Sequence, residues 1–495
     1  MTAGRPRLSL VPEDVVIPVD RLTFMVPSRR FHVEGTLLKK GYVSLATEYA
    51  MRLLRDVGEL THGELGAFLG FSDGETRTLV QELLLDGYLD ASEDRIQLAF
   101  KGETAFDPVT GELVLLDIET LDEKVTLDMI SFAPVDGPDN VRLPWIVELD
   151  IPNKERAAAA SKEGTLGFRM NFGEWRDRRF RNDGSSPITL HTLSGDAVPL
   201  GRSTVPVTVP IHYTPSQGDG IDPDFGFLRE RGRRDARKDL IEALNGAVKR
   251  IVAPGDHAEG ASFAASWDGG ILLGPSRSPT VNPLTWMQLA SQNQPSLLPD
   301  NIAPAVRIGG SAVSPGFLAR LSAFLDGVPG PDTEGVPVVW LPASHAAWGA
   351  SADLMEVSRT IKSSLSSKAG IVLMPRSDES ERSKRDLQRA YGAGRDGRQS
   401  ALFDTCVVVP AHLIPLSLEL IVQPGVWAVV LLHVPSRDGF PIPVGYATRN
   451  AEALASIGQT LSSVVAGLTE SAVAWAAHHN EPSSVLSDLE RAFRE

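Results

Sequence analysis

The fold is decided by residues 41–106, which read GYVSLATEYAMRLLRDVGELTHGELGAFLGFSDGETRTLVQELLLDGYLDASEDRIQLAFKGETAF. Two pairs in this stretch place a Ser or Thr three residues before a Glu, which is the capping-box pattern of a helix start. These pairs are Thr61 with Glu64 and Ser72 with Glu75. Gly58 stands where a glycine would end the preceding helix. Because leucines recur at helical spacing between these signals, the stretch predicts three short helices.

After the third predicted helix, residues 95–100 alternate polar and apolar side chains behind the polar turn Ser92-Glu93-Asp94, which predicts a β-hairpin. Three helices followed by a hairpin is the element order of a winged helix-turn-helix domain. Residues 41–106 resemble that family, notably in the phrases GELTHGELGAFLGF and RIQLAFKGETAF. The family usually places its third helix in the major groove of DNA, so the resemblance implies a recognition helix over residues 73–86.

The charge of residues 41–106 argues against a DNA reader. The stretch contains five cationic and twelve acidic side chains, a net charge of −7. The expected recognition helix has Arg77 as its one cation. Because neutralisation of phosphates supplies most non-specific DNA affinity, this surface would repel a duplex. DNA recognition and protein contact remain the two interpretations, and the charge favours protein contact.

Composition describes an ordinary globular chain of 495 residues with a net charge of −15, long enough for several domains. Its single cysteine, Cys406, excludes an internal disulfide and a multi-cysteine zinc site. No apolar run reaches 18 residues and the N-terminus has no apolar signal core, so we expect neither a membrane span nor secretion. These features predict a cytoplasmic protein without a cofactor, a metal site or a membrane partner.

The chain as a whole predicts a multidomain α/β protein. Residues 1–40 form a mildly basic extended arm, either a structural strand or a contact for an acidic partner. Residues 107–215 predict a β-rich middle domain, with strands over 113–118, 125–130, 145–149, 166–172 and 205–213. Residues 216–226 are rich in Pro, Gly and Asp and indicate a linker. Helices alternate with strands over 227–495, which predicts an α/β domain with a parallel or mixed sheet and a C-terminal helix.

Two arginine clusters are the candidate nucleic-acid contacts. One interleaves arginines with aromatic rings, a pattern that can stack bases and hold phosphates. It consists of Trp175, Arg176, Arg178, Arg179 and Arg181. The other precedes a predicted helix and includes Arg233, Arg234 and Arg237. Single-stranded nucleic acid or RNA, or an acidic partner protein, would suit both clusters, and a solvated strand edge would look similar.

Signals for catalysis are weak. The sequence has no Walker A motif and no G-x-S-x-G. Residues 366–455 resemble the C-terminal half of a phospholipase D-like domain, whose His-x-Lys-x-x-x-x-Asp motif falls here on His412, Ile414 and Glu419. The phosphate-binding lysine is missing, so the resemblance implies a catalytically degenerate domain. His412 would be a nucleophile only if activity were retained.

Three functions therefore stay open. The first is a non-catalytic scaffold or adaptor, with protein subunits as partners, in a bacterial complex for nucleic-acid processing or antiphage defence, where a winged helix often accompanies a degraded nuclease. The second is a divergent phosphodiesterase or nuclease with a phospholipase D-like domain. The third is a winged-helix DNA-binding regulator. The acidic charge of residues 41–106 and the missing catalytic lysine favour the first.

Overall fold

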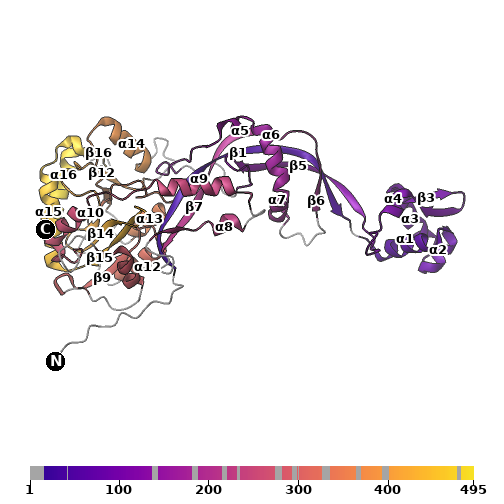
Figure 1. Ribbon diagram of the computed structural model, residues 1–495, viewed down its shortest axis with the longest axis horizontal. Coiled ribbons are helices and arrows are strands. Elements are labelled where there is room, and N and C mark those ends of the chain that lie inside the picture. Colours follow the sequence, from indigo (N-terminus) through magenta and orange to yellow (C-terminus); the bar gives the residue numbers. More distant parts are fainter. Residues whose placement is uncertain are drawn as a thin grey trace, which may run out of the picture.

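The computed structural model is elongated, with a large α/β domain at one end and a small helical module at the other (Figure 1). It describes residues 16–41, 43–135, 143–180, 188–213, 220–230, 235–273, 281–291, 298, 300–325, 335–363, 370–392, 401–476 and 481–494. A twisted sheet connects the two ends (Figure 1).

The connecting sheet, which we call the stalk, is built around strand β1 (Ile17–Lys40). A strand of 24 residues spans about 80 Å at roughly 3.3 Å per residue. One edge of β1 pairs antiparallel with β5 (Leu116–Asp128) and the other with β7 (Val198–Tyr213) and then β6 (Ile188–Leu193). The described part of the expected N-terminal arm is thus the central strand of a sheet. The expected linker is partly structured too, because β8 (Asp222–Pro223) pairs with β7.

The module at the far end, which we call the distal module, comprises residues 43–115. The predicted three helices and hairpin are confirmed in it. Its elements are α1 (Leu45–Val57), β2 (Glu59–Thr61), α2 (His62–Leu69), α3 (Asp73–Leu85), β3 (Leu89–Ser92), β4 (Arg95–Leu98) and α4 (Phe100–Thr104). Both capping boxes form as expected, and Gly58 caps α1 with a positive φ of 93°. The local signals of the sequence therefore fixed the ends of these helices.

The distal module is an insertion at the tip of a β-hairpin. Lys40 at the end of β1 faces Leu116 at the start of β5, and the amide of Gly41 donates to the carbonyl of Leu115 over 2.8 Å. The module has its own hydrophobic core, which draws only on residues between 43 and 115. That core includes Leu113 and Leu115, so the unit extends beyond the expected boundary at residue 106.

We expect Leu83→Asp to unfold the distal module without unfolding the rest of the chain. Leu83 is 3% exposed in the module core, and a buried unpaired carboxylate costs several kcal/mol, about as much as a small domain can lose. Leu85→Asp is the matched control, since Leu85 lies on the same helix and is 87% exposed. Hydrogen exchange should show lost protection across 43–115 in the first variant alone. Equal protection in both would refute the assigned core.

Three helices cover one face of the stalk: α5 (Lys154–Ala158), α6 (Ala160–Met170) and α7 (Phe172–Arg179). The strand expected over residues 166–172 is wrong, because this segment ends α6 and begins α7. The buried side of α6 runs through Ala160, Gly164 and Phe168, which is helical spacing. A Cβ at Gly164 would lie 2.7 Å from the Phe31 ring of β1, so glycine permits this close packing.

The C-terminal domain contains an eight-stranded mixed sheet, as expected, in the order β16-β12-β11-β10-β13-β14-β15-β9. Strands β10, β11 and β12 are parallel, and every other pairing is antiparallel. The strands are β9 (Ala305–Gly309), β10 (Val338–Leu341), β11 (Ile371–Leu373), β12 (Thr405–Val407), β13 (Leu418–Gln423), β14 (Trp427–Pro435), β15 (Pro441–Thr448) and β16 (Val473–Trp475). Strand β14 is buried on both faces, as in a sheet between two layers of helices.

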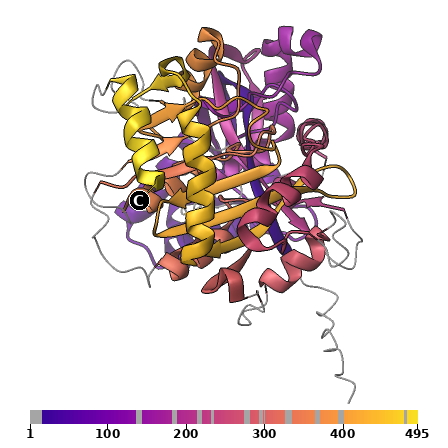
Figure 2. The ribbon, with the colours of Figure 1, turned by 90° about the vertical axis from the view of Figure 1, so that its left-hand side faces the viewer.

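Helices cover both faces of this sheet. One core contains side chains of α9 (Lys238–Lys249), α10 (His257–Asp268), α11 (Pro283–Ser291), α15 (Ala451–Ala466) and α16 (Pro482–Arg494), with α8 (Gly226–Arg229) beside them. Figure 2 shows α15 and α16, in yellow, lying across the strands. The opposite core contains side chains of α12 (Pro315–Leu325), α13 (Leu354–Ser363) and α14 (Glu381–Tyr391). Short 3-10 turns occur at Asp300–Ile302 and Glu470–Ala472.

The stalk is anchored in the C-terminal domain. Apolar residues of β1 such as Ile17, Val19 and Leu22 share one core with the eight-stranded sheet. The carbonyl of Val19 accepts from the amide of Ser311 over 2.8 Å, and the amide of Thr23 donates to the carbonyl of Ala350 over 2.7 Å. The stalk therefore extends from the C-terminal core toward the distal module.

Candidate functional site

The aromatic ring of the first candidate nucleic-acid cluster is buried. Trp175 is 8% exposed and lies on α7, in the core between the stalk sheet and its helices. Its ring is 5.4 Å from that of Phe168, 5.5 Å from that of Phe172 and 6.0 Å from that of Phe180. Base stacking requires an open ring face. The ring of Trp175 packs in the core and is not available to stack on a base.

The arginines of both clusters, where described, bind groups of the protein itself. Arg176 pairs with Asp177, Arg178 with Glu174, and Arg179 with Glu123. The side chain of Arg237 is 2% exposed, so it cannot reach a nucleic acid; it pairs with Glu174 and donates to the carbonyl of Pro134 over 2.7 Å. Arg181, Arg233 and Arg234 lie outside the described residues.

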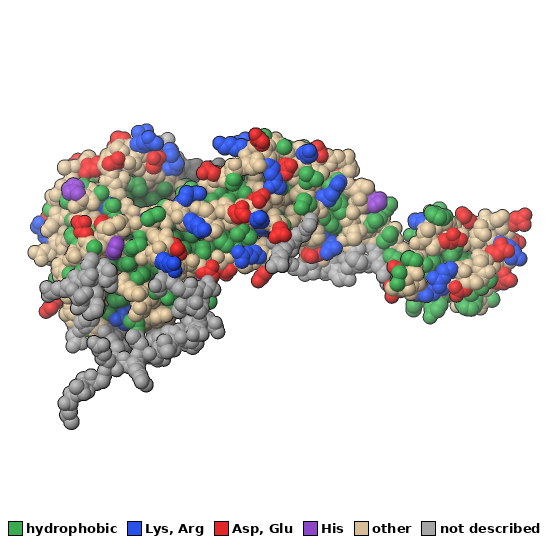
Figure 3. Space-filling model, in the orientation of Figure 1, with side chains coloured by type: hydrophobic (Ala, Val, Ile, Leu, Met, Phe, Trp, Pro, Cys, Tyr) green, Lys and Arg blue, Asp and Glu red, His purple; other side chains and the backbone are tan. Residues whose placement is uncertain are grey.

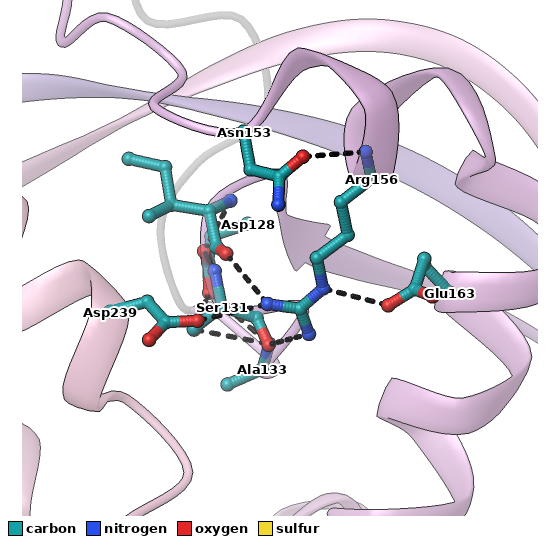
Figure 4. Close-up of polar contacts among 8 residues, drawn as sticks. Asp128, Ser131, Ala133, Asn153, Arg156, Glu163 and Asp239 are labelled. Atoms are coloured by element: carbon teal, nitrogen blue, oxygen red, sulfur yellow. Dashed lines mark hydrogen bonds and ion pairs between the residues drawn. The ribbon is translucent and has the colours of Figure 1, made fainter.

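A further arginine that the sequence did not single out joins the stalk helices to the C-terminal domain (Figure 4). Arg156 of α5 donates to Glu163 of α6 over 2.7 Å and to Asp239 of α9 over 2.9 Å. It also donates to the carbonyls of Ile130 and Ser131. One guanidinium thus connects α6, α9 and the turn at Ile130 and Ser131. Its several N–H donors lie in one plane and point in different directions, which suits this role. No motif around residue 156 could have revealed Asp239, which is 83 residues away in the sequence.

The expected catalytic histidine does not meet its expected partner. His412 is exposed in a turn after β12. Glu419, at the acidic position of the expected motif, lies on β13 and contacts a different histidine, His433 of β14, over 2.7 Å. His433 in turn contacts His345 over 2.7 Å. The structure therefore assembles a Glu419–His433–His345 chain, with Glu419 and His433 buried and His345 half-buried, that sequence reasoning missed, since these residues come from three separate segments.

Every polar atom of this chain has a partner. Glu419 Oε1 accepts from Trp340 Nε1 over 2.7 Å and from Trp348 Nε1 over 2.8 Å. The amide of Ala347 donates to His345 Nδ1, so His345 Nε2 carries the proton that goes to His433 Nδ1, and His433 Nε2 donates to Glu419.

Burial and the neighbouring His433 lower the pKa of His345 to about 2, which keeps its ring neutral. Both of its nitrogens are engaged, so neither offers a lone pair to a substrate. The arrangement is that of a satisfied structural network, which specifies one packing of the core.

The distal module exposes many large apolar side chains for its size. Of the seventeen large hydrophobic residues that are exposed in the described chain, seven belong to this module. They are Leu45, Tyr49, Val57, Phe68, Leu85, Phe100 and Val109. Figure 3 shows green side chains along the lower edge of the module and red ones over much of the rest. Exposed apolar patches bordered by polar residues are typical of protein-interaction sites.

Two of these residues precede, in the sequence, the two residues that join α3 to α4, Asp86 and Lys101. Leu85 ends α3 and is 87% exposed, and Phe100 begins α4 and is 80% exposed. Lys101 of α4 joins the two helices. Its Nζ donates to the carbonyl of Asp86 over 2.7 Å and lies 4.1 Å from the centre of the Tyr88 ring, a cation–π contact. We call the junction of α3 and α4, with Leu85 and Phe100 flanking it in the sequence, the α3–α4 tip.

The described residues contain no group of three or more His, Cys, Asp or Glu side chains that could hold a metal ion. No described helix is both long and apolar enough to span a bilayer. Comparison with protein-family models, with curated proteins and with solved structures finds no match to this chain.

Proposed function

We propose that this chain is a non-catalytic adaptor whose distal module binds a partner protein. The observation that carries the proposal is the concentration of exposed apolar side chains on a small acidic module at the end of the stalk. A module without a binding partner would be more stable with Leu85 and Phe100 buried, because burial of each large apolar side chain contributes about 1.5–3 kcal/mol. Such side chains are the usual anchors of protein interfaces.

The partner that fits this surface is a protein with a basic, partly apolar face. The exposed side of α3 presents Asp73, Glu82 and, just after the helix, Asp86, against the single cation Arg77. Opposite charges around an apolar contact steer association and exclude wrong partners. The same acidic side chains would repel duplex DNA. The charge of the module therefore favours protein contact over DNA binding, although the element order is that of a winged helix.

The proposed membership of a larger complex rests on resemblance to known families. Membership of a bacterial complex for nucleic-acid processing or antiphage defence, with a degenerate phospholipase D-like domain, is a prediction from the resemblances of residues 41–106 and 366–455. The satisfied Glu419–His433–His345 chain supports the non-catalytic half of it, because it leaves that cluster no free nucleophile.

The proposal is tested with a tagged copy expressed in the source cells. We expect Leu85→Asp with Phe100→Asp to lose one copurifying protein that the wild type retains, because the loss of two anchors of about 2 kcal/mol each weakens the affinity roughly a thousandfold. Val147→Asp with Val252→Asp, both exposed and outside the distal module, is the control. Identical partner profiles for the three proteins would contradict the proposal. Sub-micromolar binding of a labelled 20-base-pair duplex that depends on Arg77 would favour a DNA-binding regulator.

A further inference from the structure

Helix α1 of the distal module has hydrophobic side chains on two sides. One side packs in the core of the module. The other side carries Leu45, Tyr49 and Val57, which are 72%, 57% and 56% exposed, together with the half-buried Leu53. These four residues follow one another at intervals of four, and side chains four apart on a helix are neighbours. They therefore form a continuous hydrophobic row, which we call the α1 strip.

The lower edge of the distal module in Figure 3, where hydrophobic side chains gather, is the edge at which Figure 1 labels α1 and α2. The module lies at the far end of the elongated chain, away from the large C-terminal domain (Figure 1). Another molecule can therefore approach α1 without meeting the large domain of the same chain.

The spacing of the α1 strip is self-complementary. Rows of side chains four residues apart are the ridges that interdigitate in the commonest class of helix packing. The strip has two members on each side of residue 51, at equal separations. When a second α1 is turned end for end, Leu45 opposes Val57 of that copy and Tyr49 opposes its Leu53. A two-fold axis makes this contact because the same surface serves both copies.

The charges of α1 also favour a second copy. The helix has two acidic side chains, Glu48 and Asp56, and two basic ones, Arg52 and Arg55. Arg52 pairs with Glu48 over 2.8 Å and Arg55 with Asp56 over 3.5 Å. Residues 41–106 carry a net charge of −7, so all of the excess acid lies outside α1. A strongly charged partner gains no attraction at this neutral helix, whereas an identical α1 meets no repulsion there.

The size of α1 sets the expected strength of the contact. A helix of 13 residues is about 20 Å long. One pair of helices of this length buries less than the roughly 1,200 Å² that stable complexes need, and such small interfaces are transient. The expected dimer is therefore weak and reversible, with a dissociation constant on the order of 10–100 μM.

We propose that two copies of this chain associate through their α1 strips, packed end for end about a two-fold axis. The proposal goes beyond the adaptor function, because the α1 strip contains neither Leu85 nor Phe100 of the α3–α4 tip. It can be tested on the purified chain, in the absence of any partner protein.

Sedimentation equilibrium of the full chain, from about 1 to 300 μM, tests the proposal. We expect a reversible monomer–dimer equilibrium that Tyr49→Glu weakens about a hundredfold. Loss of one central aromatic contact costs about tenfold, and a two-fold interface contains the residue twice. Val109→Glu is the matched control, since it adds the same charge to the same module at a residue that is 92% exposed and outside α1. Hydrogen exchange of residues 43–115 should be equal in both variants.

The response to salt separates this contact from the adaptor contact. Salt screens the repulsion between two acidic modules, so the α1 dimer should tighten as salt rises. Binding of a basic partner to the acidic side of the module should weaken under the same change. Failure of one contact therefore leaves the other measurable.

Disulfide trapping tests the register. Cys406 is buried, so an introduced cysteine on α1 would be the exposed thiol. A mixture of Tyr49→Cys and Leu53→Cys chains should form more cross-linked dimer than either variant alone.

A chain that stays monomeric over the whole concentration range overturns the proposal, as does equal weakening by Tyr49→Glu and Val109→Glu. A monomeric chain from which Tyr49→Glu removes a different copurifying protein would show that another protein, and not a second copy, covers the α1 strip. Absence of preferential cross-linking in the mixture would overturn the two-fold arrangement.

Discussion

Replacing Glu419 by Ala should lower the free energy of unfolding of the C-terminal domain by about 4 kcal/mol. The carboxylate accepts from Trp340, Trp348 and His433, and its side chain is 1% exposed. Trp340 and His433 are also buried. Without the acceptor, their N–H groups stay buried without a partner, and each such group costs about 1–3 kcal/mol.

The measurement is urea unfolding followed by tryptophan fluorescence. Glu356→Ala removes an exposed carboxylate that pairs with Arg359 and should leave the midpoint unchanged, because surface ion pairs contribute little. The urea midpoint of Glu419→Gln should lie between those of Glu419→Ala and Glu356→Ala. Glutamine keeps one acceptor oxygen but turns an amide N–H₂ toward a donor. A wild-type midpoint for Glu419→Ala would mean that the buried chain is not a structural network. Loss of a phosphodiesterase activity in a folded Glu419→Ala or His412→Ala protein would restore the enzyme hypothesis.

Excising the distal module should leave the remainder of the chain folded. Lys40 and Leu116 are paired at the end of β1 and β5, so an Asn-Gly turn in place of residues 41–115 closes a regular hairpin. No residue of the module core belongs to the other hydrophobic cores. We expect hydrogen exchange to show unchanged protection in β1 and β7.

The contrasting variant is Phe31→Asp in the middle of β1. Phe31 is fully buried beneath Gly164, and a carboxylate there should unfold the stalk. Loss of β1 protection in the excised chain, equal to that in Phe31→Asp, would show that the module is an integral part of the sheet.

Prediction from sequence succeeded where the signal was local. The helix starts at Thr61 and Ser72 depend on a side chain three residues away, and both capping boxes form. The alternation of helices and strands after residue 227 gave the mixed sheet for a similar reason, because each element carries its own periodicity. The edge strands β9 and β16 have five and three residues, which are too few to show a period in the sequence.

Prediction failed where the partner was distant. Strand β1 pairs with β7 across a sequence separation that runs from Ile17–Tyr213 to His32–Val198, so the sequence near the N-terminus predicts only an extended arm and not its partner strand. The apolar residues 166–172 resembled a strand because glycines interrupt the helical pattern of α6.

The contacts of the candidate site residues were also hard to predict where the partners are distant in sequence. The pairing of Arg179 with Glu123 has no signal in the sequence, because the two residues are 56 positions apart, whereas Glu174 lies only one helical turn before Arg178. The exposure of Leu85 and Phe100 could not be read from apolar residues in a helical pattern, which normally point inward.

The most direct test of the adaptor function compares partner retention by the wild-type chain and the excised chain. Both are tagged, expressed at equal levels in the source cells, cross-linked and quantified by mass spectrometry. We predict that one protein with a basic surface is recovered with the wild type and cross-links to residues 43–115, and that its recovery falls at least tenfold with the excised chain. Retention of every partner by a folded excised chain would contradict the account, because the distal module would then not be the binding site.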